Sequence, residues 1–252
     1  MAMKADEVTP AQPLPARAPG APATPSAPLP AALAAEYGAR WNELTRRWAA
    51  RPGTTLATLG PAGTSSELAA RFLAAEHDLS VELFDTFDEV LDHVIGHKAD
   101  LALVPSAYGG LTRFHWHRDL SLQGFFPMAT PEYGIASATG NPPAPGTGPV
   151  TVAAMWEVRR IYAEVVPPGL DARQVAWVDV SSTQAAAEAV AAGQAELAVT
   201  NAPGIRAHGL RWLAVRPGAE IIWTLFSRAD ETPRADETPR AGEAPPATAL
   251  RT

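Results

Sequence analysis

Residues 54–105 read TTLATLGPAGTSSELAARFLAAEHDLSVELFDTFDEVLDHVIGHKADLALVP and alternate short apolar runs with longer amphipathic ones. The short runs predict strands and the longer ones predict helices, in the order TTLATL, SSELAARFLAAE, VELFD, TFDEVLDHVIGHK and ADLALVP. This alternation is typical of a parallel sheet covered by helices. The predicted fold class is therefore α/β.

A second alternating set follows, and two return segments close it. Its strands and helices are expected in YGIASAT, TVAAM with WEVRRIYAEVV, VAWVDV, TQAAAEAVAAG and AELAVT, and the return segments are LRWLAV and IIWTLFSR. We expect two lobes, the first made of 54–105 plus 202–228 and the second of 106–201. Ligands of such open sheets bind at the carboxyl ends of the strands, here in a cleft between the lobes.

Both ends of the chain differ from this domain. Residues 1–30 are rich in Pro and Ala, and residues 229–252 repeat ADETPR, so we expect two disordered tails that bury no core. Residues 31–50 carry apolar side chains three or four apart, at Leu33, Tyr37, Trp41, Leu44 and Trp48. This spacing predicts an N-terminal helix that packs on the domain or on a second subunit.

The composition excludes several kinds of function. The chain has no cysteine and a net charge of −7, so it offers no disulfide, thiolate or cysteine-zinc site and no basic stripe for nucleic acid. It has no apolar run of about 20 residues for a membrane span, and its first residues lack the apolar run of a secretory signal, so we expect a cytoplasmic protein. His115 and His117 have no third ligand at useful spacing, and no metal or cofactor is expected.

Two hydroxyl-rich segments stand where a strand passes into a helix. In LGPAGTSSELAA, Thr64 or Ser65 should cap the helix, and in VDVSSTQAAAEA one of Ser181, Ser182 and Thr183 should do so. Either segment alone is most simply an ordinary N-cap. Together, facing one cleft, they would hold a small dianion through N–H groups and short hydroxyls. The candidate binding residues are Thr64, Ser65, Ser66, Ser181, Ser182 and Thr183.

Polar residues at other strand ends complete the candidate site. Ser106 and Tyr108 follow the last strand of the first set and should lie at the hinge. Thr200 and Asn201 end AELAVT, and Thr224 lies in the return strand, although each could merely satisfy backbone groups. Arg113 and, as a further alternative, Arg159 are the arginines considered for a carboxylate.

Three linked segments resemble the prephenate dehydratases. LGPAGTSSELAA resembles their opening motif, FDTFDEVLDHVIGHKADLALVP resembles the Phe-x-x-Phe segment that ends in Val-Pro-Ile-Glu-Asn-Ser, and VSSTQAAAEAVAAGQAELAVTNAPGIRAHGLRWLA resembles their Ser-Ser-Thr segment with the helix after it. The resemblance covers residues 54–228. It implies the two-lobed type-2 periplasmic-binding-protein fold of the catalytic domain, with no ACT domain.

The departures from that family are specific. Ser106, Ala107 and Tyr108 stand where dehydratases have Glu-Asn-Ser, and Thr224-Leu225-Phe226 stands where they have the catalytic Thr-Arg-Phe. Together with GTSSE, VPSAY and TPEYG, these changes resemble the prephenate decarboxylases of bacilysin, anticapsin and salinosporamide biosynthesis. Those enzymes remove the ring carboxylate, retain the 4-hydroxyl and protonate a ring carbon.

The resemblance implies a cofactor-independent lyase of antibiotic-type metabolism, acting on prephenate as a homodimer. Tyr108 or a water held by Thr224 would donate the proton, and Ser106 would lie beside them. Two alternatives remain at this stage: a prephenate dehydratase that forms phenylpyruvate, and a protein that only binds a small molecule.

Overall fold

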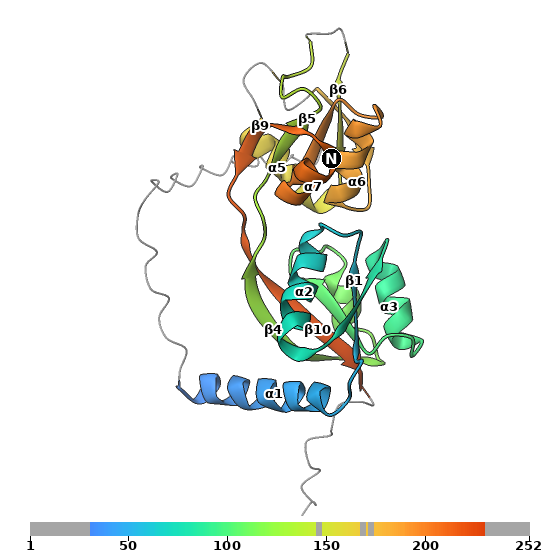
Figure 1. Cartoon of the computed structure of the whole chain (residues 1–252), viewed down its shortest axis with the longest axis vertical. Coiled ribbons are helices and arrows are strands. Elements are labelled where there is room, and N and C mark those ends of the chain that lie inside the picture. The colour runs from blue at the N-terminus through green and yellow to red at the C-terminus, as the bar shows by residue number, and fades with distance from the viewer. Residues whose placement is uncertain (1–30, 145–147, 167–169, 171–173, 230–252) are drawn as a thin grey trace, which may run out of the picture. The chain divides into compact units, whose positions relative to one another are not determined.

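The computed structural model describes residues 31–144, 148–166, 170 and 174–229 (Figure 1). The chain divides after Gly38 into two units, so the first turns of helix α1 (Ala31–Ala49) belong to one unit and all other described elements to the second. The helix predicted over residues 31–50 is thus present. The predicted tails, 1–30 and 229–252, lie outside the described residues except for Ala229.

The second unit contains two five-stranded sheets, one in each lobe. The sheet of lobe one has the order β2-β1-β3-β10-β4, from the strands β1 (Thr55–Leu59), β2 (Ser80–Phe84), β3 (Leu101–Pro105), β4 (Leu120–Ala129) and β10 (Glu220–Arg228). Strand β1 is parallel to β2 and β3, whereas β10 is antiparallel to β3 and β4.

Helices cover both faces of the sheet of lobe one. Helix α2 (Ser65–His77) and the second half of α1 pack on one face, where Leu73 meets Leu44 and Trp48 in one buried cluster. Helices α3 (Phe87–Ile95) and α4 (Leu111–His115) contribute to the cluster on the other face. Val90 and Val94, four apart on α3, are fully buried there, as expected of residues on one helix face.

Lobe two repeats this arrangement. Its sheet has the order β7-β6-β8-β5-β9, from the strands β5 (Tyr133–Ser137), β6 (Val150–Ala154), β7 (Val175–Asp179), β8 (Leu197–Asn201) and β9 (Arg211–Arg216). Its helices are η1 (Trp156–Val158), α5 (Arg159–Val165), α6 (Thr183–Ala191) and α7 (Ala202–His208). Alanines of α6 pack on one face and Tyr162 of α5 on the other.

The α/β class and the two-lobed architecture are confirmed, but the predicted lobe limits were wrong at both crossings. Strand β4, which the sequence pattern does not predict, pairs with β10 and belongs to lobe one. Strand β9 belongs to the sheet of lobe two, and Ile205 of α7 packs in a core cluster of lobe two. Gly124 and Pro127 interrupt the apolar pattern of β4. A proline is tolerated there because β4 is an edge strand.

Two short segments, residues 130–132 and 217–219, connect the lobes. They are tied together by hydrogen bonds from the Thr130 amide to the Ala219 carbonyl (2.8 Å) and from the Ala219 amide to Thr130 Oγ1 (3.0 Å). A Cβ at Gly218 would lie 1.9 Å from the Thr130 carbonyl oxygen, so only glycine permits this approach. Among the described residues, we find no helix that is both long and apolar enough to cross a membrane.

Candidate substrate cleft between the two lobes

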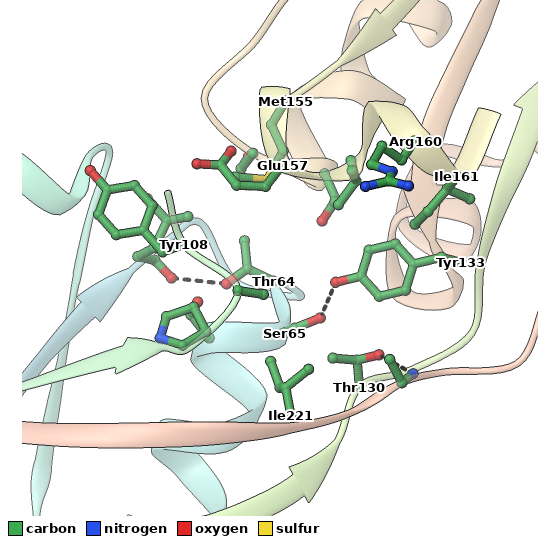
Figure 2. A pocket seen from close by; sticks show the side chains of 18 of the residues that line it. Thr64, Ser65, Tyr108, Thr130, Tyr133, Met155, Glu157, Arg160, Ile161 and Ile221 are labelled. Atoms are coloured by element: carbon green, nitrogen blue, oxygen red, sulfur yellow. Dashed lines mark hydrogen bonds between the residues drawn. The ribbon is translucent and has the colours of Figure 1, made fainter. Parts of the chain in front are cut away.

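A cleft of about 250 Å³ lies between the lobes, and both lobes contribute side chains to it (Figure 2). This volume is slightly below the usual range for small-molecule sites, roughly 300 to 1,000 Å³. Apolar side chains make most of the wall, including Leu59, Phe87, Met155, Ile161, Ile221 and Trp223. Hydroxyl and charged groups make the remainder, so the cleft suits a small amphiphilic molecule with few polar groups.

The start of α2 reaches the cleft from lobe one. Thr64 caps this helix by accepting the Glu67 amide at 3.1 Å, and its own hydroxyl donates to the Leu59 carbonyl at 2.9 Å. Both hydrogen bonds of this hydroxyl therefore stabilise the start of α2. The amides of Ser65 and Ser66 have no acceptor within the helix, as is general for a first turn. The Ser66 hydroxyl has no partner among the described residues, so it and these two amides are available to an anion.

The start of α6 reaches the same cleft from lobe two. Ser182 is the N-cap and accepts the Ala185 amide at 3.0 Å. Ser182 and Thr183 both line the cleft, whereas Ser181 is exposed and lines a shallower hollow beside it. The expected meeting of two hydroxyl-rich helix starts in one cleft is therefore found for five of the six candidates, Thr64, Ser65, Ser66, Ser182 and Thr183.

Hydrogen bonds across the cleft hold the two helix starts together. The Gly63 carbonyl accepts Gln184 Nε2 at 2.8 Å and Asn201 Nδ2 at 3.0 Å. Gly63 has a φ of 90°, and a Cβ there would lie 2.7 Å from Gln184 Nε2. Asn201 also caps α7 by accepting the Gly204 amide at 2.9 Å. Asn201, a predicted binding residue, thus acts as a connector between the lobes and does not line the cleft.

Three other predicted residues satisfy backbone groups instead of lining the cleft. The Thr200 hydroxyl donates to the Thr183 carbonyl and the Thr224 hydroxyl to the Val104 carbonyl, both at 2.6 Å. Ser106 Oγ accepts the Ile222 amide at 3.2 Å. The structure therefore places Ser106, Thr200 and Thr224 in the supporting framework. A strand-end hydroxyl beside a neighbouring strand finds a carbonyl as readily as a ligand.

Tyr108 lines the cleft with its ring, which lies 4.4 Å from that of Phe87 between centroids. In Figure 2 its hydroxyl points away from the enclosed space. Burial raises the pKa of Tyr108 above its ordinary value, and the Asp88 carboxylate raises it further. Arg113 is exposed, forms an ion pair with Asp88 and lines the hollow beside the cleft. The expected role of Arg113 in binding is not supported by this position.

Charged residues in the cleft were not identified from the sequence. Glu157, Arg160 and Glu164 come from η1 and α5, and Arg216 ends β9. Arg216 pairs with Glu164 at 3.0 Å, whereas the exposed Arg160 has no partner among the described residues and points into the cleft in Figure 2. Arg159, the alternative considered, pairs with Asp179 outside this cleft. The sequence does contain a pattern that groups these residues, because positions 157, 160, 161 and 164 have the spacing of one helix face.

Tyr133 was also missed, although its segment TPEYG is part of the resemblance. It begins β5 at the crossing between the lobes, and its hydroxyl lies 2.6 Å from Ser65 Oγ in lobe one. Burial raises the pKa of Tyr133 above the ordinary value of 10.0, and the hydrogen bond with Ser65 lowers it in part. A neutral phenol therefore faces the cleft beside the start of α2 (Figure 2).

Known proteins resemble the chain over most of its length. No family model matches it. It is 31% identical over 185 residues to a prephenate decarboxylase of Planktothrix agardhii, covering 68% of this chain and 86% of the relative. The prephenate decarboxylase of Bacillus amyloliquefaciens is 30% identical over 186 residues, covering 70% and 87%. The chain belongs to the prephenate decarboxylase family.

A solved structure agrees with this family at the level of the fold. The prephenate dehydratase of Arthrobacter aurescens in complex with L-Phe has a TM-score of 0.50 and 22% identity, covering 69% of this chain. The chain spans 60% of that dehydratase chain. The expected α/β fold with two lobes is confirmed for this member of the prephenate decarboxylase family, and it is similar to the fold of that dehydratase.

The two hydrogen bonds of the Thr64 hydroxyl should contribute to the stability of the folded protein. Thr64→Ala removes the cap on Glu67 and the bond to Leu59 together, so the free energy of unfolding should fall by about 1 to 2 kcal/mol in urea titrations. Thr64→Ser keeps the hydroxyl and should retain most of that stability. Unchanged stability of Thr64→Ala with weaker ligand binding would mean instead that the hydroxyl meets the ligand.

Proposed function

We propose that the chain catalyses the decarboxylation of prephenate, with loss of the ring carboxylate, retention of the 4-hydroxyl and protonation of the ring. The observation that carries this proposal is the 31% identity over 185 residues to a curated prephenate decarboxylase. The cleft supports it, because a small, largely apolar space with a few anion-binding groups suits a compact cyclic dianion.

The net charge of −7 gives no broad attraction for a dianion, so local groups must bind the two carboxylates of prephenate. We propose that Arg160 binds the pyruvyl carboxylate, because it is the lining arginine that is not neutralised by a carboxylate among the described residues. The amides of Ser65 and Ser66 are the second source of positive potential.

The ring carboxylate needs a different environment, because it must lose its charge as carbon dioxide. A firm grip on both carboxylates would stabilise the bound substrate and slow the reaction. We propose that the ring carboxylate lies against apolar side chains such as Phe87, Met155 and Ile221. Removal from water raises the energy of the carboxylate more than that of the charge-dispersed transition state.

Two positions support decarboxylation over dehydration. Leu225, which stands where the dehydratases have arginine, is fully buried in the core of lobe one. Ala107, which lies in the segment where they have Glu-Asn-Ser, presents a methyl group to the cleft. Expulsion of the 4-hydroxyl needs help from an acid, and neither of these side chains supplies a proton. Their chemistry favours a product that keeps the hydroxyl.

The resemblance also bears on the pathway, the cellular location and the oligomeric state of the protein. We infer from the resemblance a role in bacilysin- or anticapsin-type antibiotic biosynthesis, a cytoplasmic location and a homodimer. Sedimentation equilibrium of the purified full chain measures the last of these directly, and a mass of one chain would contradict it.

The activity is tested by incubating the purified protein with prephenate and recording carbon dioxide and the ultraviolet spectrum. Because dehydration to phenylpyruvate also releases carbon dioxide, the spectrum decides between the two reactions. We expect carbon dioxide in proportion to the prephenate consumed and no enol absorbance in alkali. Strong enol absorbance would identify a dehydratase, and unchanged prephenate that remains bound would identify a binding protein.

A further inference from the structure

Decarboxylation leaves an electron pair in the ring, and a proton must reach a ring carbon before the product is complete. The two donors considered from the sequence are poorly placed for this task. The Tyr108 hydroxyl points away from the enclosed part of the cleft (Figure 2). Thr224, which was expected to hold a donor water, does not line the cleft, and its hydroxyl donates to the Val104 carbonyl. The donor must therefore be sought elsewhere on the wall of the cleft.

Tyr133 has the position and the chemistry of a donor. Its hydroxyl lines the cleft and lies 2.6 Å from Ser65 Oγ, between the Ser65 end of α2 and Arg160 in Figure 2. Burial raises the pKa of Tyr133, so the phenol carries its proton at neutral pH. Ser65 is itself buried and can accept and return a proton or stabilise the phenolate through its hydroxyl.

The backbone around Tyr133 holds the phenol in place. Gly134, the next residue, packs so closely on β9 that a Cβ would lie 2.1 Å from the Ala214 carbonyl oxygen. Strand β5 is therefore pressed against its neighbour at this residue. On the other side, the bonds from Gln184 and Asn201 to the Gly63 carbonyl hold the loop that precedes Ser65 against lobe two. Ser65 and Tyr133 thus meet only when the lobes are together.

We propose that Tyr133 is the general acid that protonates the ring, with Ser65 as its hydrogen-bond partner. This inference rests on the proposed decarboxylation of prephenate. The bond from the ring to the carboxylate breaks and its electron pair forms a new ring double bond. The adjacent double bond shifts its pair to its far carbon, which takes the proton from the Tyr133 hydroxyl. Carbon dioxide leaves, and the phenolate regains a proton from water through Ser65.

Tyr133→Phe is the direct test, because it keeps the ring and removes only the hydroxyl. A general acid contributes about 100-fold to 10,000-fold, so kcat should fall at least about 100-fold while the Kd for prephenate changes less than about threefold. Reaction in D2O adds a readout that a structural role would not move. The full chain should place deuterium on one face of the ring, and the slow residual reaction of Tyr133→Phe should place it on both.

Three other variants separate this inference from its rivals. Ser65→Ala should lower kcat by about tenfold, the effect of one weakened hydrogen bond to the donor. Tyr108→Phe and Glu157→Gln test two other polar side chains of the cleft, and a larger loss in either than in Tyr133→Phe would overturn the assignment. Full activity of a folded Tyr133→Phe would also overturn it. Failure of the unaltered protein to release carbon dioxide from prephenate would instead reject the proposed function.

Discussion

Arg160→Gln should lower kcat/KM for prephenate by about 10-fold to 100-fold, because a charge-assisted hydrogen bond contributes roughly 1.5 to 3 kcal/mol and each 1.36 kcal/mol is one decade. Arg160 lines the cleft and is not paired with a carboxylate among the described residues. Its charge is therefore free to meet the pyruvyl carboxylate. The loss should appear mainly in KM, since this carboxylate does not react, and steady-state kinetics at constant ionic strength measure it.

Two arginines outside the cleft provide controls for Arg160. Arg206 is exposed at the end of α7, and Arg206→Gln should change kcat/KM by less than about twofold. Arg113→Gln tests the candidate chosen from the sequence, which pairs with Asp88 beside the cleft. A larger effect of Arg113→Gln than of Arg160→Gln would contradict the assignment of the pyruvyl carboxylate.

Gly134→Ala should destabilise the protein by about 3 kcal/mol or more, because the added methyl group would clash with backbone atoms and a strand would have to shift to make room for it. The new Cβ would lie 2.1 Å from the Ala214 carbonyl oxygen and 3.0 Å from Val215 Cα, both in the backbone of the neighbouring strand β9. Thermal and urea unfolding measure the loss. Activity should fall with it, since the shift of β5 moves Tyr133 away from Ser65.

A matched glycine substitution tests whether the close contact is the cause. Among the described residues, none lies within 4 Å of a Cβ added at Gly148, and Gly148→Ala should leave the melting temperature within about 1 °C, as is usual for surface changes away from close contacts. If Gly134→Ala proves as stable as Gly148→Ala, β5 and β9 must separate easily. The tight placement of Tyr133 argued from this contact would then be wrong.

Local patterns were sufficient to predict the elements next to the cleft. The caps of α2 and α6 were expected at Thr64 or Ser65 and at one of the residues 181–183, and they are found at Thr64 and Ser182. Helix caps are local, because a side-chain oxygen bonds an amide two or three residues later. The order of strands and helices could likewise be recognised from periodicity.

Features that depend on distant contacts were not predicted. The hydroxyls of Thr200 and Thr224 find carbonyls on segments remote in the chain, and no local pattern distinguishes this from ligand binding. Tyr133 meets Ser65 only because two lobes close on each other. The predicted lobe limits were wrong because they also depend on distant contacts: β4 pairs with β10, about a hundred positions away.

We expect this protein to remove the ring carboxylate of prephenate and to keep the 4-hydroxyl. The most direct measurement is the proton NMR spectrum of the product formed from prephenate by the purified full chain in D2O. We predict olefinic signals, a retained proton on the carbon that bears the hydroxyl, and one deuteron on a ring carbon. Aromatic signals of phenylpyruvate, without olefinic ones, would show that the protein is a dehydratase instead.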